Sequence, residues 1–186
     1  MNDERALAML EYKSIGWGLE CTDKLLKGFP VELILLRVVC PGKLLSAIAG
    51  ETAAVWGALQ YARNEYLAPN LTYIDDFFLG NPAPGLGQAL RATAPIRELD
   101  ALGIIETFTA SSALVAADTA AKAALVTLVT IHLARGLGGK AHIYLTGSVG
   151  AVEAALEAVE KRLEPGLLAH KALLASPSPV TWSAIF

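Results

Sequence analysis

The amino-acid sequence contains two copies of one pattern, and this repeat constrains the fold more than any other feature. Residues 6–11 are matched by residues 101–106 at an offset of 95 positions. Later in each copy the offset becomes 97 positions, where residues 42–43 are matched by residues 139–140. A chain of 186 residues built in this way is expected to form two similar small domains.

Each copy is expected to have the element order β-α-β-β-α-β, which makes the fold class α+β. The clearest periodicity is helical: apolar residues of the second copy step by 3 or 4 positions along one face, at Val149, Val152, Leu156, Val159 and Leu163. The first copy is predicted to have strands at residues 7–11, 33–39, 44–49 and 71–79, and helices at 15–27 (with Gly28 as C-cap) and 52–66. We therefore expect a first domain at residues 5–80, a linker rich in proline and glycine at 81–99, and a second domain at 100–186.

The composition limits the classes of function. Charged residues make up 18% of the chain, against a usual share of about 25%, and hydrophobic residues make up 54%. Such a chain is expected to hide apolar surface in an obligate oligomer. The net charge of −3 argues against a nucleic-acid partner. No charge-free apolar run is long enough to cross a membrane, and the polar start is unlike a secretory signal, so we expect a cytoplasmic protein.

A cysteine lies at a tight turn between two apolar runs, in residues 38–43. Pro41 fixes its own φ and favours an extended Cys40, while Gly42 accepts a positive φ. The other cysteine, Cys21, lies on a predicted helix and is expected to pack in the core. Two cysteines make neither a disulfide framework in a cytosolic protein nor a metal site within one chain.

The second copy carries the pattern A-L-G-I-I-E-T, then A-A-D-x-x-x-K, and then G-x-V-G-A-V-E-A-A. In these motifs it resembles the bacterial microcompartment shell domain over residues 101–175, and the first copy is a more diverged version. The whole chain is most similar to the tandem-domain trimeric shell proteins, in particular the propanediol-utilisation type that carries an iron–sulfur cluster. The resemblance implies two ferredoxin-like domains per chain and a homotrimer that imitates a hexagon. It also implies edge-to-edge packing with other shell proteins.

The resemblance also implies roles for individual residues. Three copies of Cys40 would meet at a central pore and hold one [4Fe-4S] cluster. The cluster would pass electrons across the shell to a redox partner. The cluster-bearing relatives share the sequence Cys-Pro-Gly-Lys found here at residues 40–43. Lys27 and Lys122 would lie at the tile edge, although neither copy keeps the Pro-Arg-Pro-His segment of single-domain shell proteins. The pore loops would comprise Cys40, Pro41, Gly42, Lys43, Arg135, Gly136, Leu137, Gly138 and Gly139.

Several alternatives stay open from the sequence. Cys40 on its own could be an inert packed residue, or three copies could hold zinc. A tile without a cluster could conduct small metabolites or cofactors through its pore. A cytosolic enzyme or small-ligand regulator is a third reading, but we find no catalytic constellation, and no enzyme is expected. The glycine-rich segment 135–141 fails as a phosphate loop because Ala141 stands where Ser or Thr is required.

The remaining ionisable residues favour structural roles. Glu11 and Asp23 recur at the equivalent positions of the second copy as Glu106 and Asp118, which is typical of a scaffold and not of a catalytic pair. The three histidines show no metal-ligand spacing and are expected to be packed or interfacial; they are His132, His142 and His170.

Overall fold

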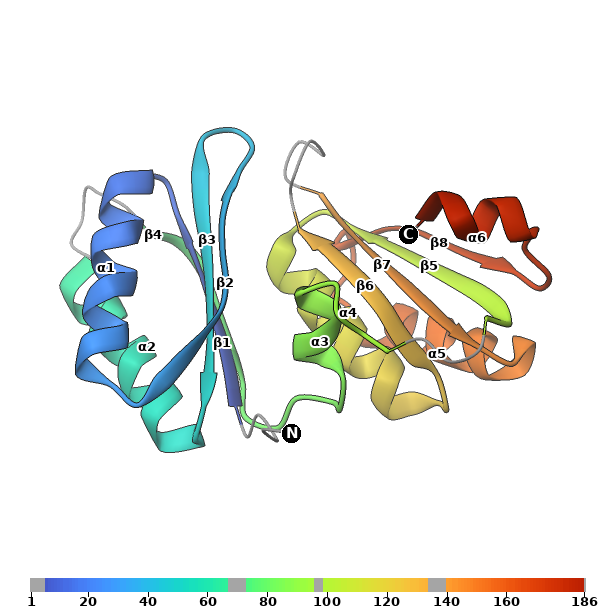
Figure 1. The fold of residues 1–186 in the computed structure, drawn as a ribbon, viewed down its shortest axis with the longest axis horizontal. Coiled ribbons are helices and arrows are strands. Elements are labelled where there is room, and N and C mark those ends of the chain that lie inside the picture. The colour runs from blue at the N-terminus through green and yellow to red at the C-terminus, as the bar shows by residue number, and fades with distance from the viewer. Residues whose placement is uncertain (1–5, 67–72, 96–98, 134–139, 186) are drawn as a thin grey trace. The chain divides into compact units, whose positions relative to one another are not determined.

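The computed structural model describes residues 6–66, 73–95, 99–133 and 140–185, and the chain forms two compact units, Met1–Pro82 and Ala83–Phe186. Figure 1 shows, in each unit, a sheet with the longer helices on one face. The first unit contains β1 (Ala6–Tyr12), α1 (Ile15–Gly28), β2 (Val31–Val39), β3 (Lys43–Gly50), α2 (Thr52–Tyr66) and β4 (Tyr73–Leu79). The second contains α3 (Leu86–Leu90), β5 (Ala101–Thr107), α4 (Ala110–Ala123), β6 (Thr127–Leu133), β7 (Ala141–Gly147), α5 (Val149–Arg162), β8 (Leu168–Leu174) and α6 (Pro179–Ile185).

Both sheets have the same antiparallel topology, with strand orders β2-β3-β1-β4 and β6-β7-β5-β8. This is the ferredoxin-like arrangement, so the predicted α+β fold class is confirmed. Even the irregularities repeat. The register shifts between Leu33 and Leu35 on β2 and between Leu128 and Thr130 on β6, at equivalent positions of the two copies. The duplication therefore extends to the local bends of the strands.

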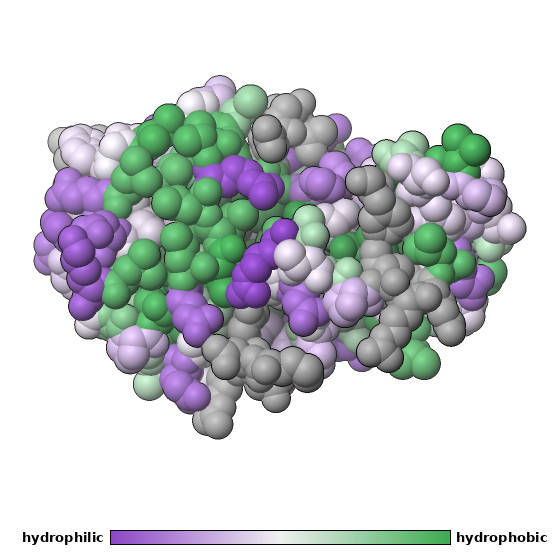
Figure 2. Space-filling view, in the orientation of Figure 1, coloured by the Kyte–Doolittle hydropathy of each residue, from purple (hydrophilic) through white to green (hydrophobic). Residues whose placement is uncertain are grey.

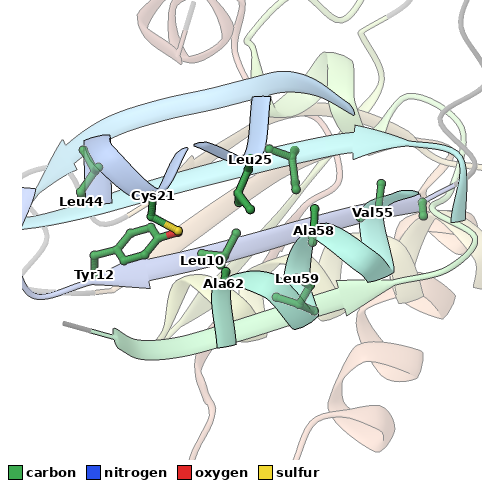
Figure 3. Packing of buried hydrophobic residues seen from close by; sticks show 12 residues of the cluster. Leu10, Tyr12, Cys21, Leu25, Leu44, Val55, Ala58, Leu59 and Ala62 are labelled. Atoms are coloured by element: carbon green, nitrogen blue, oxygen red, sulfur yellow. The ribbon is translucent and has the colours of Figure 1, made fainter. Parts of the chain in front are cut away.

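Successive side chains of each strand point to opposite faces, so each sheet has a helix-facing side and an opposite side. In the first unit, Leu10 and Tyr12 of β1 face α1 and α2 and belong to a fully buried cluster with Leu25 and Leu59. Figure 3 shows these side chains between the sheet and the two helices. Burial of apolar surface in this layer is the main force that fixes the helices on the sheet.

Side-chain caps define where the helices begin. The Ser14 side chain accepts a hydrogen bond from the backbone N–H of Trp17 at the start of α1. In the second unit, Thr109 and Ser112 form a reciprocal capping box at the start of α4. The predicted C-cap at Gly28 is wrong by one residue: Gly28 ends the helix, and Phe29 in extended conformation is the cap, donating to the Leu25 carbonyl at 3.0 Å.

Two helices were not predicted. The segment expected as a linker, 81–99, contains α3, whose residues Leu86 and Leu90 are buried. The second lies at the end of the chain, where Pro179 opens α6 and Ser178 accepts from the backbone N–H of Thr181. None of the helices in the described part of the chain is long and apolar enough to cross a membrane.

Candidate functional site

The Cys40 turn closes the β2–β3 hairpin of the first unit. Val39 pairs with Lys43, so three residues, 40–42, connect the strands. The Cys40–Pro41 peptide bond is cis, and Gly42 has a φ of +75°, which a glycine accepts without strain. Cys40 is exposed in the single chain, so it is not a packing residue of its own unit. The turn therefore presents a thiol at the end of the sheet.

An ion pair fixes the base of this turn. Lys43 donates to Glu11 of β1 at 2.6 Å, and the side chains are only 28% and 13% exposed. The pair joins the first residue of β3 to a neighbouring strand, which supports the scaffold interpretation of Glu11. Lys43 is therefore a structural part of the predicted pore turn, a role that the sequence alone did not reveal.

The second predicted pore loop falls outside the described residues. It comprises Arg135, Gly136, Leu137, Gly138 and Gly139. The loop ends with Lys140, which corresponds to Lys43 but has a different contact: its ammonium lies 5.2 Å from the centre of the Phe108 ring. The two copies have therefore diverged at the equivalent lysine.

The described side chains of one chain do not have the arrangement that a metal ion requires of its ligands. No group of three or more His, Cys, Asp or Glu side chains among the described residues is arranged to hold a metal ion. Cys40 supplies one soft thiolate ligand of the type that iron–sulfur clusters use. A cluster at this turn would consequently require thiols from several chains.

The other cysteine is a core residue, as expected. Cys21 is fully buried, and the Tyr12 hydroxyl donates a hydrogen bond to its sulfur at 3.3 Å. Burial raises the pKa of the Cys21 thiol, and the Tyr12 hydrogen bond opposes that shift in part. Figure 3 shows the two side chains in contact. Cys21 is therefore unsuited to metal binding or to reaction with solvent.

The two predicted edge lysines form equivalent contacts of different exposure. Lys27 pairs with Asp23 at 2.6 Å, and both side chains are more than half exposed. Lys122 pairs with Asp118 at 2.7 Å, but Asp118 is largely buried and also accepts from the Ala83 backbone N–H at 2.7 Å. Asp118 thereby anchors the segment that leads into α3.

The three histidines are brought together by the register of the second sheet. His132 on β6 pairs with His142 on β7, which pairs with Glu106 on β5, which pairs with His170 on β8. Directly opposed residues project from the same side of a sheet, so the four form one row. The imidazoles of His132 and His142 stack with centroids 4.6 Å apart. The sequence reasoning did not find this row.

A pocket of about 590 Å³ lies in the second unit between the end of β8 and α6. Trp182, Pro177 and Leu99 contribute apolar walls, and Asp100 contributes a carboxylate. Ser176 and Ser183 also line it, but no histidine, lysine or second carboxylate among the described lining residues accompanies Asp100, so we assign the pocket no catalytic arrangement.

Apolar side chains are exposed on the edge of the first sheet. β2 is the terminal strand, and Leu33, Leu36 and Val38 on it are 39%, 39% and 53% exposed. Figure 2 shows hydrophobic residues gathered over the first unit, in the region where Figure 1 draws β2 and β3. An edge strand with exposed apolar residues is a typical interaction surface.

Comparison with known proteins gives consistent matches over both units. The BMC domain family matches residues 6–82 and again residues 101–177. The bacterial microcompartment shell protein PduT of Citrobacter freundii is 34% identical over 179 residues, covering 96% of each chain. A microcompartment protein from Desulfitobacterium hafniense DCB has a crystal structure with a TM-score of 0.89 and 38% identity, covering 96% of this chain and 98% of that one. A fused permuted hexameric shell protein from the RMM microcompartment shares the fold, with a TM-score of 0.56, 23% identity and coverage of 83% and 79%.

Proposed function

The chain belongs to the BMC-domain family of bacterial microcompartment shell proteins, and we propose that three copies form a hexagon-like tile that carries a [4Fe-4S] cluster at its centre. Each chain contributes two BMC domains, so three chains bring six domains into one ring. The protein is a structural component of a shell in the bacterial cytoplasm, and we assign it no catalytic role.

The exposed apolar edge of the first sheet supports association of copies. Burial of Leu33, Leu36 and Val38 against a neighbouring subunit would remove apolar surface from water and cover the open hydrogen-bonding edge of β2. Lys27 and Lys122 are proposed to lie at the outer edge of the tile, where neighbouring tiles pack. Their ion pairs with Asp23 and Asp118 would hold the lysine side chains along the helix surface.

The exposed thiol of Cys40 is the observation that carries the cluster proposal. The donor type fits, since thiolates are the ligands of iron–sulfur clusters. One exposed cysteine per chain also fits a shared site, because three thiols around a three-fold axis would hold three irons and leave the fourth to an exogenous ligand. The likeness to the microcompartment shell protein PduT extends over 96% of both chains and supports the shell role.

When bound, the cluster would supply reversible one-electron transfer. The chain's own residues would present and protect it. The Glu11–Lys43 pair holds the base of the turn, which limits the positions that Cys40 adopts. Cys21 is buried and does not compete for iron. A redox partner would approach at the pore, and the electron would cross the shell at this point.

Anaerobic reconstitution with iron and sulfide tests the proposal. We expect a brown protein with broad visible absorption, about one cluster per three chains, and an electron paramagnetic resonance signal after reduction. Cys40→Ser should abolish the signal, whereas Cys21→Ala should retain it because Cys21 is a core residue. Light scattering should give a trimer for the native chain and for both variants.

The alternatives predict different results. A trimer that stays colourless after reconstitution would support a cluster-free tile whose pore conducts small metabolites or cofactors. Iron binding that is unchanged in Cys40→Ser would place the metal elsewhere. A stable monomer would contradict the shared site, because one chain supplies a single exposed thiol among its described residues.

A further inference from the structure

We propose that the stacked pair of His132 and His142 makes the β6–β7 hairpin a pH-sensitive element, which loosens when the pair takes up protons. The two residues are direct partners in the strand register. Their ring centroids are 4.6 Å apart, and the ring planes are inclined by 28° to each other. The inference rests on these contacts and is independent of Cys40 and of any cluster.

The pair lies on the face of the second sheet that is turned away from α5. A Cβ added at Gly103 of β5 would contact the side chains of both Leu145 of β7 and Val152 of α5, so these positions share the helix-facing side. His142 lies three residues before Leu145 on the same strand and therefore points to the other side. Both imidazoles are half-buried. Protons reach them from solvent, while the fold reduces their hydration.

This arrangement disfavours a positive charge on the pair. Two imidazolium ions at this separation repel each other, and a half-buried site screens that repulsion less than water does. Burial lowers the pKa of His142 from its ordinary value of 6.5, and the neighbouring His132 lowers it further. Glu106, directly opposite His142 on β5, acts in the other direction but does not cancel the shift. The folded hairpin therefore favours a neutral His142.

The nearest polar groups on the same face are uncharged at neutral pH. The ring of Tyr144 lies 4.9 Å from that of His142, and the Thr130 hydroxyl lies 3.5 Å from Nε2 of His132. His170 lies at the far end of the row, across from Glu106 on β8, and is exposed. Further protonation along the row thus adds positive charge and does not relieve the pair.

The other elements packed against β6 and β7 were considered for compensating charge. The short helix α3 beside β6 contains no ionisable residue. Lys140, just before β7, directs its ammonium to the ring of Phe108. The longer helices cover the opposite face of the sheet, so their ionisable residues do not face the pair (Figure 1). These residues are Asp118 and Lys122 of α4, and Glu153, Glu157, Glu160, Lys161 and Arg162 of α5.

The direction of the pH effect follows from the two states of His142. Its pKa is lower in the folded hairpin than in the unfolded chain, so the unfolded chain binds more protons between the two values. The stabilising contribution is complete above the ordinary value of 6.5 and is lost as the pH falls from there toward the folded value. Because β6 is the terminal strand of its sheet, the loss should appear first as opening of β6 from β7.

The first unit provides an internal contrast. Its β2–β3 hairpin has Arg37 opposite Leu45 at the positions equivalent to His132 and His142. Arginine keeps its charge at every pH at which the protein folds, and leucine has none. The β2–β3 hairpin should therefore not respond to pH in the range in which histidine titrates.

Proton NMR titration of the full-length chain tests the origin of the effect, since the chain has only three histidines. We expect the pKa of His142 to lie below 6.5, to rise in His132→Gln and to fall further in Glu106→Gln, because the first substitution removes a like charge and the second an opposite one. His132→Arg, which copies the first unit, should also lower it. A His142 pKa at or above 6.5, or one that His132→Gln fails to raise, overturns the proposal.

Amide hydrogen exchange tests the effect on the hairpin, with rates corrected for their intrinsic dependence on pH. Between about pH 7.5 and about pH 5.5, where histidine titrates and most carboxylates do not, peptides of β6 and β7 should lose protection while those of β2 and β3 keep it. His142→Leu, which copies Leu45, should abolish this loss, and so should His142→Gln.

His170→Gln is the matched control, because His170 lies on the same face but beyond Glu106, and not in the stacked pair. It should lose protection at low pH as the parent does. Circular dichroism at the higher pH checks the fold of each variant. Equal loss of protection in both hairpins, or a loss that persists in the folded His142→Leu and His142→Gln chains, overturns the proposal.

Discussion

Arg63 on α2 forms a two-point ion pair with Asp76 on β4, with both nitrogen–oxygen distances at 2.6 Å. At the equivalent positions of the second unit, Lys171 on β8 donates to Glu160 on α5 at 2.7 Å. The same contact is therefore present in both units with the charges exchanged. In each unit the bridge joins the second helix to the last strand, and only the sign of the charge on the helix differs.

Loss of the first bridge should cost more than loss of the second. Asp76 is 13% exposed and Arg63 is 30% exposed, so Asp76→Ala leaves a partly buried charge and should lower the free energy of unfolding by roughly 1–2 kcal/mol. Lys171→Ala should cost less than about 1 kcal/mol, because Glu160 is 58% exposed and water screens the pair. Urea unfolding measures both variants. Equal losses would contradict the difference in burial.

A charge-exchange variant separates the bridge from its individual residues. Arg63→Glu combined with Asp76→Lys copies the polarity of the second unit and should recover part of the stability lost in Asp76→Ala. Recovery should be incomplete, because Arg63 also lies 5.6 Å over the ring of Trp56. A double variant less stable than Asp76→Ala would show that the first unit does require its own polarity.

The helices and strands that occur in both copies could be predicted from the sequence, because each copy shows the same pattern of apolar residues. The predicted helix at 52–66 agrees with α2, and the predicted strand at 7–11 lies within β1 (Ala6–Tyr12). The bends in β2 and β6 were not predicted, since a register shift depends on pairing with β3 and β7.

The two missed helices have different physical origins. α3 has five residues beside Gly85, a composition typical of a turn, and it packs against β6 through contacts that only the folded unit provides. α6 did have a local signal, since Ser178 before Pro179 is a typical N-cap followed by a proline at the first helical position.

The candidate sites were predictable to different extents. The turn at Cys40 was predictable because turn chemistry is local, and the structure adds that Cys40 is exposed; its role as a ligand stays a prediction. The histidine row was hidden, because His132, His142 and His170 are far apart in sequence and meet only through strand pairing. If Leu133 had been paired with Ala141 in a predicted hairpin, the same register would have placed His132 opposite His142.

Ser46 offers a stabilising substitution. Its hydroxyl is fully buried and has no hydrogen-bond partner among the described residues, and the equivalent residue of the second unit is Ile143. Ser46→Ala should raise the free energy of unfolding by about 1 kcal/mol, because an unpaired hydroxyl leaves the core.

Thr146→Val is the control for Ser46→Ala. Thr146 is also buried, but its hydroxyl oxygen accepts from the Asp100 N–H at 3.2 Å. This variant should lose about 1 kcal/mol. Destabilisation by both substitutions in urea unfolding would mean that Ser46 has a partner in solution.

The two thiols should react at very different rates. Iodoacetamide is expected to modify the exposed Cys40 in the cluster-free protein and to leave Cys21 unmodified until the chain unfolds, as mass spectrometry of peptides will show. Burial raises the pKa of Cys21, so little thiolate is present at neutral pH. Because the folded-state pKa is the higher one, this neutral thiol favours the fold below the ordinary thiol pKa, and the contribution is lost as the pH rises through the folded value. Rapid labelling of Cys21 in the folded chain would contradict its position in the core.

Substitution of the two lysines proposed to lie at the tile edge should separate effects on tile packing from effects on the stability of each unit. Lys27→Ala removes an exposed ion pair and should change the free energy of unfolding by less than about 0.5 kcal/mol. Lys122→Ala removes the ion pair of the largely buried Asp118, which keeps its hydrogen bond from the Ala83 N–H, and should lower the free energy of unfolding by about 1 kcal/mol. If both lysines lie at the tile edge, each variant should remain a trimer by light scattering and should form fewer extended sheets by electron microscopy. Lys161→Ala is the matched control, since its exposed pair with Glu157 has the same spacing on α5. Sheets lost equally in the control would mean that surface charge in general, and not the edge positions, governs assembly.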